Sequence, residues 1–135
     1  MICIVDVLNA LSDDKALILY NAIALGGGQN FKTLIKNMGI TPHQYYSRIL
    51  KITKAGLVKR ENGKYVTTAL GNVVYDAIST VGKAVECYWA IKTIESFQSI
   101  AHDDSENHVS RLIDTLIDDH KIRKILMEIP IMSAS

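Results

Sequence analysis

Apolar residues recur at helical spacing over most of this chain, and that pattern predicts a mainly helical protein. A short first helix is indicated by an apolar face near the N-terminus, made of Ile4, Val5, Leu8 and Leu11. Ser12 is the expected N-cap of a second helix, and Asp13 and Asp14 follow it in the first turn, where carboxylates favour the helix dipole. The chain is therefore expected to begin with two consecutive helices.

The second helix is expected to end at a run of glycines. Its apolar face is formed by Ala16, Leu17, Leu19, Tyr20, Ile23 and Ala24. The glycines at residues 26–28 are not a phosphate-binding loop, because no strand precedes them and no Lys-Ser or Lys-Thr pair follows. We interpret them as a helix exit that leads to a short helix over residues 31–38, with Phe31, Leu34 and Ile35 facing inward.

The clearest helix start is Thr41-Pro42, an N-cap residue followed by proline at the first helical position. The helix that begins there runs to about Ala55, and Gly56 ends it. Its expected core positions, with one residue beyond its end, are Tyr45, Ile49, Ile52 and Leu57.

A β-hairpin is expected next, over the segment Leu57–Thr67. Two short strands flank Asn62-Gly63, which is the preferred dipeptide for a two-residue hairpin turn. Thr68 then caps another helix, which is expected to reach about Ala101 with a weak point at residues 79–82. A loop over residues 102–105 precedes a last helix, residues 106–129.

The two C-terminal helices carry more apolar surface than a small N-terminal domain can cover. The residues concerned are Val81, Ala84, Val85, Tyr88, Trp89, Ile91, Ile94, Val109, Leu112, Ile113, Leu116, Ile117, Ile125 and Leu126. A partner subunit is the expected cover, which favours a homodimer, and the alternative is a helical hairpin folded back on the first helix. The expected division is a domain over residues 1–80 and a helical dimerisation region over residues 81–135.

Charge is distributed unevenly along the chain, although the whole protein has a formal net charge of only +1. The segment 27–72 holds eight lysines and arginines but a single carboxylate, Glu61, whereas the other residues hold seven cations and thirteen acids. A basic patch on a nearly neutral protein favours a polyanionic partner that meets one face, although a solvated lysine-rich surface is the alternative.

The side chains opposite the expected core of the 41–55 helix suit the major groove of DNA. That face carries His43, Gln44, Ser47, Lys51 and Lys54, with Tyr46 and Arg48 at its flanks. Gln44 has the groups for a bidentate pair with adenine, and Arg48 and Lys51 can reach guanine or phosphate. Ser47 is small enough to permit close approach. The free N–H groups at the helix start favour a phosphate.

Further cations extend this surface. Lys59, Arg60 and Lys64 surround the tip of the hairpin, which suits the minor groove or its flanking phosphates. Lys32 and Lys36 on the preceding helix are expected to hold the DNA backbone.

Three segments of the sequence resemble known regulators. They are Ala10-Leu11-Ser12-Asp13, the series Tyr45…Ile49…Ile52…Ala55-Gly56-Leu57-Val58, and Tyr65-Val66-Thr67-Thr68-Ala69-Leu70-Gly71. Together with the order of elements, they resemble the winged helix-turn-helix of small prokaryotic regulators in the broad ArsR/MarR-like group, including small archaeal ones. The chain departs from that pattern at Ile52, where leucine is usual, and at residues 66–68.

This resemblance covers residues 8–78 and implies a DNA-binding transcriptional regulator with C-terminal dimerisation helices. It implies that the recognition helix Thr41–Ala55 enters the major groove and that the wing Leu57–Thr67 meets the minor groove or the backbone of double-stranded DNA. A winged helix that docks a protein is the alternative. Tyr46 either contacts a base or packs, and Leu50 either contacts a thymine methyl or packs against the wing.

A metal- or ligand-responsive repressor is a further alternative. The possible ligands are His102, Asp103, Asp104, Glu106 and His108, and then Asp118, Asp119 and His120. Their spacing matches no specific metal-binding motif, so a solvated acidic loop is the favoured interpretation and no metal ligand is assigned. The Cys-x-Cys of thiolate sensors is also missing from the recognition helix.

The remaining features favour a cytoplasmic, nucleoid-associated protein. Cys3 and Cys87 are far apart and match no metal-ligand spacing, which is typical of a reducing compartment. The N-terminus lacks the features of a secretory leader, and no apolar run approaches the roughly 18 residues of a membrane span. No catalytic motif or cofactor motif is recognisable, so we do not expect an enzyme.

Overall fold

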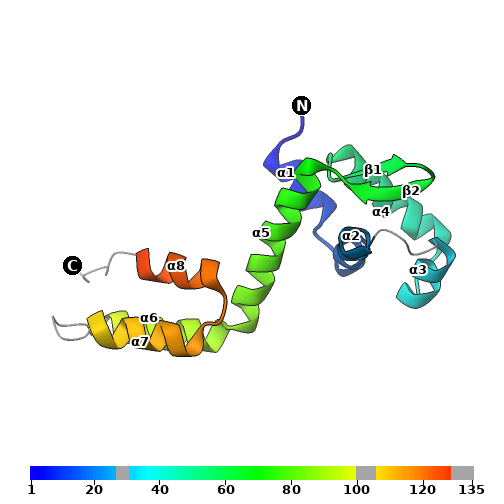
Figure 1. Cartoon of the computed structure of the whole chain (residues 1–135). Helices are drawn as coiled ribbons and strands as arrows, with labels where there is room; N and C mark the ends of the chain where they lie inside the picture. Colours follow the sequence, from blue (N-terminus) through cyan, green and yellow to red (C-terminus); the bar gives the residue numbers. More distant parts are fainter. Residues whose placement is uncertain (27–30, 100–105, 129–135) are drawn as a thin grey trace. The chain divides into compact units, whose positions relative to one another are not determined.

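The computed structural model of the chain describes residues 1–26, 31–99 and 106–128 and confirms a mainly helical protein with a small antiparallel hairpin (Figure 1). The chain divides into two compact units, Met1–Asp76 and Ala77–Ser135. The glycines at 27 and 28, the expected loop over residues 102–105 and the C-terminal tail lie outside the described residues.

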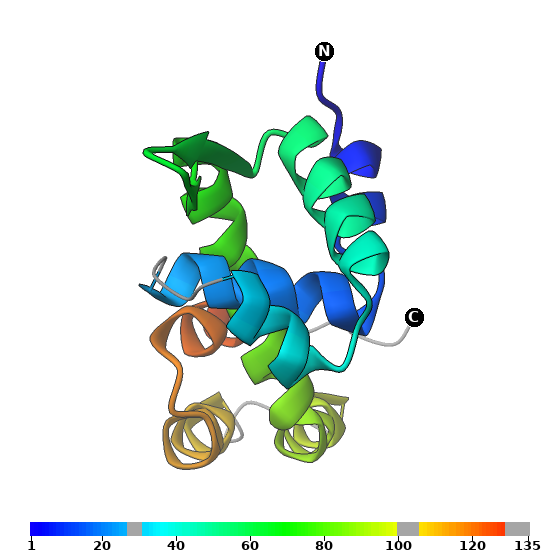
Figure 2. The ribbon, with the colours of Figure 1, turned by 90° about the vertical axis from the view of Figure 1, so that its right-hand side faces the viewer.

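The first unit consists of four helices, the hairpin and the start of a fifth helix. In chain order these are α1 (Ile4–Ala10), α2 (Asp14–Gly26), α3 (Phe31–Met38), α4 (Pro42–Lys54), β1 (Val58–Glu61), β2 (Lys64–Thr67) and α5 (Ala69–Glu86). Helix α2 packs against α4 and β2, and α1 lies alongside α4 (Figure 2). Fully buried side chains from α2 and α4, among them Leu19, Tyr20 and Ile52, form the core of this unit.

Local sequence signals fix both ends of α4 and the hairpin that follows it. The Thr41 hydroxyl accepts a hydrogen bond from the Gln44 backbone N–H, and the Gln44 side chain accepts one from the Thr41 N–H, both at 3.1 Å. Gly56 ends the helix with a φ of 81°. Asn62 and Gly63 also have positive φ, as the expected two-residue turn requires, and Glu61 pairs with Lys64 across it.

The start of α5 is joined closely to the exit of α4. The Thr68 hydroxyl accepts from the Gly71 N–H at 2.9 Å and donates to the Gly56 carbonyl at 2.5 Å. The Tyr20 hydroxyl donates to the Gly71 carbonyl, and burial raises the pKa of this phenol to about 12. No side chain fits at Gly71, because a Cβ there would overlap the Leu57 carbonyl oxygen. This junction therefore connects α2, the base of the hairpin and α5.

The short first helix is confirmed as α1, Ile4–Ala10. Of the apolar residues that predicted it, Ile4, Val5 and Leu8 are exposed, whereas Leu11 is buried. Apolar spacing thus located the helix, and which of its residues are buried depends on how it packs beside α4.

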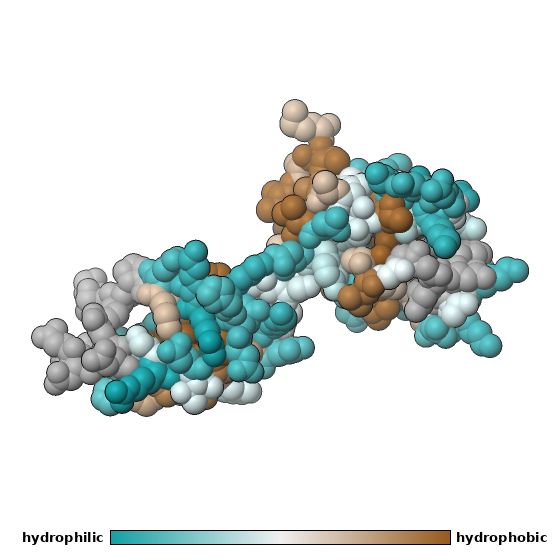
Figure 3. All heavy atoms as spheres, viewed as in Figure 1, coloured by the Kyte–Doolittle hydropathy of each residue, from teal (hydrophilic) through white to brown (hydrophobic). Residues whose placement is uncertain are grey.

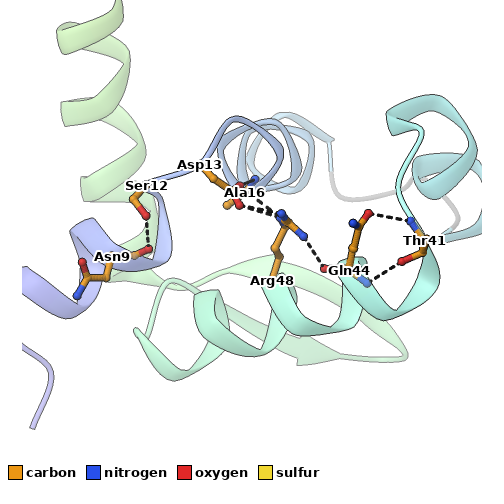
Figure 4. Close-up of polar contacts among 7 residues, drawn as sticks. All are labelled: Asn9, Ser12, Asp13, Ala16, Thr41, Gln44 and Arg48. Atoms are coloured by element: carbon orange, nitrogen blue, oxygen red, sulfur yellow. Dashed lines mark hydrogen bonds and ion pairs between the residues drawn. The ribbon is translucent and has the colours of Figure 1, made fainter.

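The expected N-cap of α2 was displaced by one residue. Asp13 caps the helix, because its carboxylate accepts a hydrogen bond from the Ala16 N–H at 2.6 Å (Figure 4). The Ser12 hydroxyl instead donates to the Asn9 carbonyl at 2.8 Å and so serves the end of α1. Two neighbouring capping residues thus serve two different helices.

The second unit contains the end of α5 and three further helices, α6 (Tyr88–Ser99), α7 (Glu106–Leu116) and α8 (His120–Glu128). Its core is formed by Ile94, Val109, Ile113, Ile117, Ile122 and Leu126. Helix α7 packs against both α6 and α8. Much of the apolar surface on these C-terminal helices is therefore covered within the chain.

Two expected long helices are each divided in the structure. The first is interrupted at Cys87 and not at residues 79–82, where serine, threonine and glycine cost too little to stop a helix. The second expected helix, residues 106–129, is divided into α7 and α8. The Asp119 carboxylate accepts a hydrogen bond from the Ile122 N–H at 3.0 Å and so caps the start of α8. The Arg123 guanidinium donates to the carbonyls of Ile117 and Asp114, at 2.8 Å for the latter, so the end of α7 is also capped.

We expect Gly71→Ala to lower the free energy of unfolding by about 2–3 kcal/mol, because the new methyl must displace the Leu57 carbonyl. Gly82→Ala is a matched control on the same helix, since a Cβ at Gly82 meets no atom within 4 Å. That control should stabilise the protein by about 0.5–1 kcal/mol. Thermal unfolding followed by circular dichroism measures both. Similar effects of the two substitutions would contradict the close approach.

Candidate nucleic-acid interface

Helix α4 has one buried face and one exposed face. Tyr45, Ile49 and Ile52 are buried against the core of the first unit, as the spacing predicted. The exposed side chains are His43, Tyr46, Ser47, Leu50, Lys51 and Lys54. Residues separated by three or four positions lie side by side on a helix, so these form one continuous strip.

The two remaining candidates on α4, Gln44 and Arg48, are half-buried and engaged within the chain. Gln44 takes part in the capping box with Thr41, as described above. Arg48 donates one hydrogen bond to the Gln44 carbonyl at 3.2 Å and turns its guanidinium toward Asp13 at the start of α2 (Figure 4). Both side chains support the position of α4, and their expected contact with DNA stays a prediction.

The contact between Arg48 and Asp13 links α4 to α2. The guanidinium Nη2 lies 2.8 Å from the Asp13 carboxylate, and Nε donates to the same carboxylate at 3.0 Å. The hydrogen bond from Arg48, with that from the Ala16 N–H, holds the pKa of Asp13 below its ordinary value. Asp13 therefore caps its own helix and pairs with α4 at once. The sequence predicted neither role, since it placed Asp13 in the first turn with Ser12 as the cap, and Arg48 is 35 positions away.

The hairpin presents its cations on two faces. Directly opposed residues of antiparallel strands share a face, so Arg60 lies on the same side as Tyr65. Both are close enough to Tyr45 on α4 to influence its phenol, whose pKa is raised mainly by burial. Lys59 lies on the other face of β1, with its ammonium 3.5 Å from Glu61.

Further exposed cations lie on the hairpin and on α3. Lys64 begins β2 next to the turn, and Lys32 and Lys36 lie on α3. Figure 3 shows hydrophilic residues gathered over the hairpin, whereas hydrophobic residues gather over α1. Among described residues 31–72 the only carboxylate is Glu61. The first unit therefore has a predominantly basic surface along α3, α4 and the hairpin.

Two apolar side chains interrupt the basic strip on α4. Tyr46 is 55% exposed and Leu50 is 53% exposed. The Tyr46 ring meets the buried Tyr45 ring edge to face, with centroids 5.4 Å apart. Leu50 is therefore not a core residue, and both alternatives, contact with a base and packing against the wing, stay predictions.

Of the residues considered as possible metal ligands, Asp119 has another role. It caps α8 and pairs with the Lys83 ammonium at 3.3 Å, and its hydrogen bond from the Ile122 N–H lowers its pKa. No group of three or more His, Cys, Asp or Glu side chains suited to a metal occurs among residues 1–26, 31–99 and 106–128. The residues considered at 102–104 lie outside the described residues. None of the helices in the described parts has the length and apolar run that crossing a bilayer requires.

In comparisons with known proteins, no family model, no curated protein and no solved structure matches this chain.

We expect the two roles of Asp13 to be separable by substitution. Asp13→Asn keeps a capping oxygen but removes the charge beside Arg48, and should lower the free energy of unfolding by no more than about 1 kcal/mol. Asp13→Ala removes both contacts and should cost about 1–2 kcal/mol. Urea unfolding at neutral pH, followed by circular dichroism, measures the difference.

The acid dependence gives an independent check on the same pair. The folded-state pKa of Asp13 is lowered from 3.8, so its charge-dependent stabilisation is fully present above that value. It is lost as the pH falls through the lowered pKa. The advantage of the wild type over Asp13→Asn should disappear in the same range. An advantage that persists at lower pH would contradict a charge-dependent role for Asp13.

Proposed function

We propose that this protein is a winged helix-turn-helix regulator that binds double-stranded DNA. In this proposal α3 and α4 are the helix-turn-helix, α4 enters the major groove, and the hairpin β1–β2 is the wing. The observation that carries the proposal is the exposed basic strip on α4, with Lys51 and Lys54, next to a hairpin whose exposed Arg60 shares a face of β1 with buried Val58. A duplex is a polyanion with a groove that admits one helix.

The supporting contacts of α4 favour this function because a reading helix must be held rigidly. Its inner face is buried, its start is capped by Thr41 and Gln44, and Arg48 binds the carboxylate at the start of α2. These contacts leave the outer strip exposed and well oriented. In this proposal the lysines of α4 and of the hairpin bind phosphates, and the other side chains of the outer strip meet base edges.

We expect DNA binding to depend steeply on salt. Each phosphate contact contributes about −0.9 to the slope of log K against log salt concentration, so Lys51→Ala or Arg60→Ala should flatten the slope by about that amount. Lys124→Ala is the matched control, since it removes the same charge from an exposed position on α8. Electrophoretic shifts of genomic fragments across a salt series measure the slopes. If no fragment binds the wild type at low salt, the proposed function is wrong.

We also propose that the protein pairs as a homodimer through the second unit. The apolar residues on either side of the break between α5 and α6 differ in burial. Ala84, Cys87, Ala90 and Ile91 pack against the core of this unit. Val81, Val85, Tyr88 and Trp89 are exposed, with Trp89 at 78%. These four residues are exposed apolar surface that a partner subunit would cover. A two-fold dimer carries two copies of α4, which suits operators with two half-sites.

Val85→Glu should dissociate the dimer, because it places a carboxylate among the exposed apolar residues that the partner would cover. Ser110→Glu, at an exposed position on α7, is a control of equal charge. Light scattering should give twice the 15.0 kDa chain mass for the wild type and the control, and the chain mass for Val85→Glu. Trp89 is the sole tryptophan, so its emission should shift to the blue on association. A monomeric wild type at micromolar concentration contradicts the dimer.

A further inference from the structure

Two apolar side chains, Tyr46 and Leu50, lie among the cations of the outer strip of α4. They are separated by four positions, so they are neighbours on the helix surface. Both remain more than half exposed, whereas Ile49 and Ile52 of the same helix are buried. If a partner binds this strip, the part of it that meets Leu50 should be apolar.

The surroundings of the pair restrict what that occupant can be. Leu50 has Ser47 on the preceding turn and Lys54 on the next, and Lys51 follows it directly. The occupant must therefore carry negative charge around a small apolar group. A DNA duplex has this combination, because phosphates line the groove and the C5-methyl of thymine is the apolar group on its floor. The other bases present only donors and acceptors there.

We propose that Leu50 is a specificity residue that reads a thymine methyl in the major groove, with Tyr46 forming the wall beside it. This inference rests on the proposed DNA-binding function and adds the base that the site selects. The Tyr46 ring is held by its edge-to-face contact with buried Tyr45, so the wall is already in place before DNA arrives. The preferred operator contains thymine opposite the middle of α4. His43 and Ser47, which are also exposed, face the neighbouring base pairs.

The test uses duplexes that differ by one methyl group. The purified full-length protein selects sites from a random-sequence duplex library, and each thymine of the enriched site is then replaced singly by deoxyuridine. For the wild type, at least one replacement should weaken binding about fourfold, the effect of one buried methyl group. For Leu50→Ala that same replacement should have no effect, so the two changes are not additive. Lys54→Ala should weaken binding to both duplexes equally and keep the ratio.

The outcomes separate this inference from the proposed function. If the wild type enriches no duplex, both are wrong. If it binds duplexes but no thymine is sensitive to deoxyuridine, or the sensitivity persists in Leu50→Ala, the methyl-reading role is wrong while DNA binding stands. Because Leu50 is exposed, Leu50→Ala should keep the wild-type circular dichroism spectrum and unfolding temperature, and Leu50→Met provides a second variant that retains an apolar side chain.

Discussion

The close approach between the first turn of α5 and Leu57, the residue before β1, is the constraint on which the first unit depends. At Gly71 the backbone of α5 lies so near the Leu57 carbonyl that even one methyl group has no room. Thr68 and Tyr20 add hydrogen bonds to the same junction from the loop and from α2. The hairpin leaves from this point, so its orientation beside α4 is set by packing at its base and not by its own two short strands.

Helix α4 is supported from behind by polar contacts as well as by its apolar face. The pair formed by Arg48 and Asp13 fixes α4 against the start of α2, and the capping box fixes its first turn. Neither contact is deeply buried, so each contributes modestly to stability. Their larger effect is on position, since they limit rotation of the helix about its axis. A surface that must bind a rigid partner gains from that limit, because it loses less conformational freedom on binding.

Much of this arrangement could be predicted from the sequence, because its signals are local. The cap at Thr41, the turn at Asn62-Gly63 and the buried spacing of Tyr45 each depend on a few adjacent residues. Long-range contacts could not be predicted in this way. Which residues of α1 are buried depends on how it packs beside α4, and the pairing of Arg48 depends on a carboxylate far away in the chain. An exposed-looking arginine on a basic helix gives no signal that it is already paired.

Supporting and outward-facing positions alternate along α4, and this affects which substitutions the helix can accept during evolution. Supporting positions such as Arg48 and Gln44 are committed to contacts inside the chain, whereas His43, Ser47 and Leu50 face outward and touch little of it. Under the proposed function, substitutions at the outward positions alter the preferred operator, while the contacts that hold α4 in place stay intact. Asp13 and Arg48, in contrast, are expected to change only together across related sequences. New binding preferences can then evolve without passing through unstable intermediates.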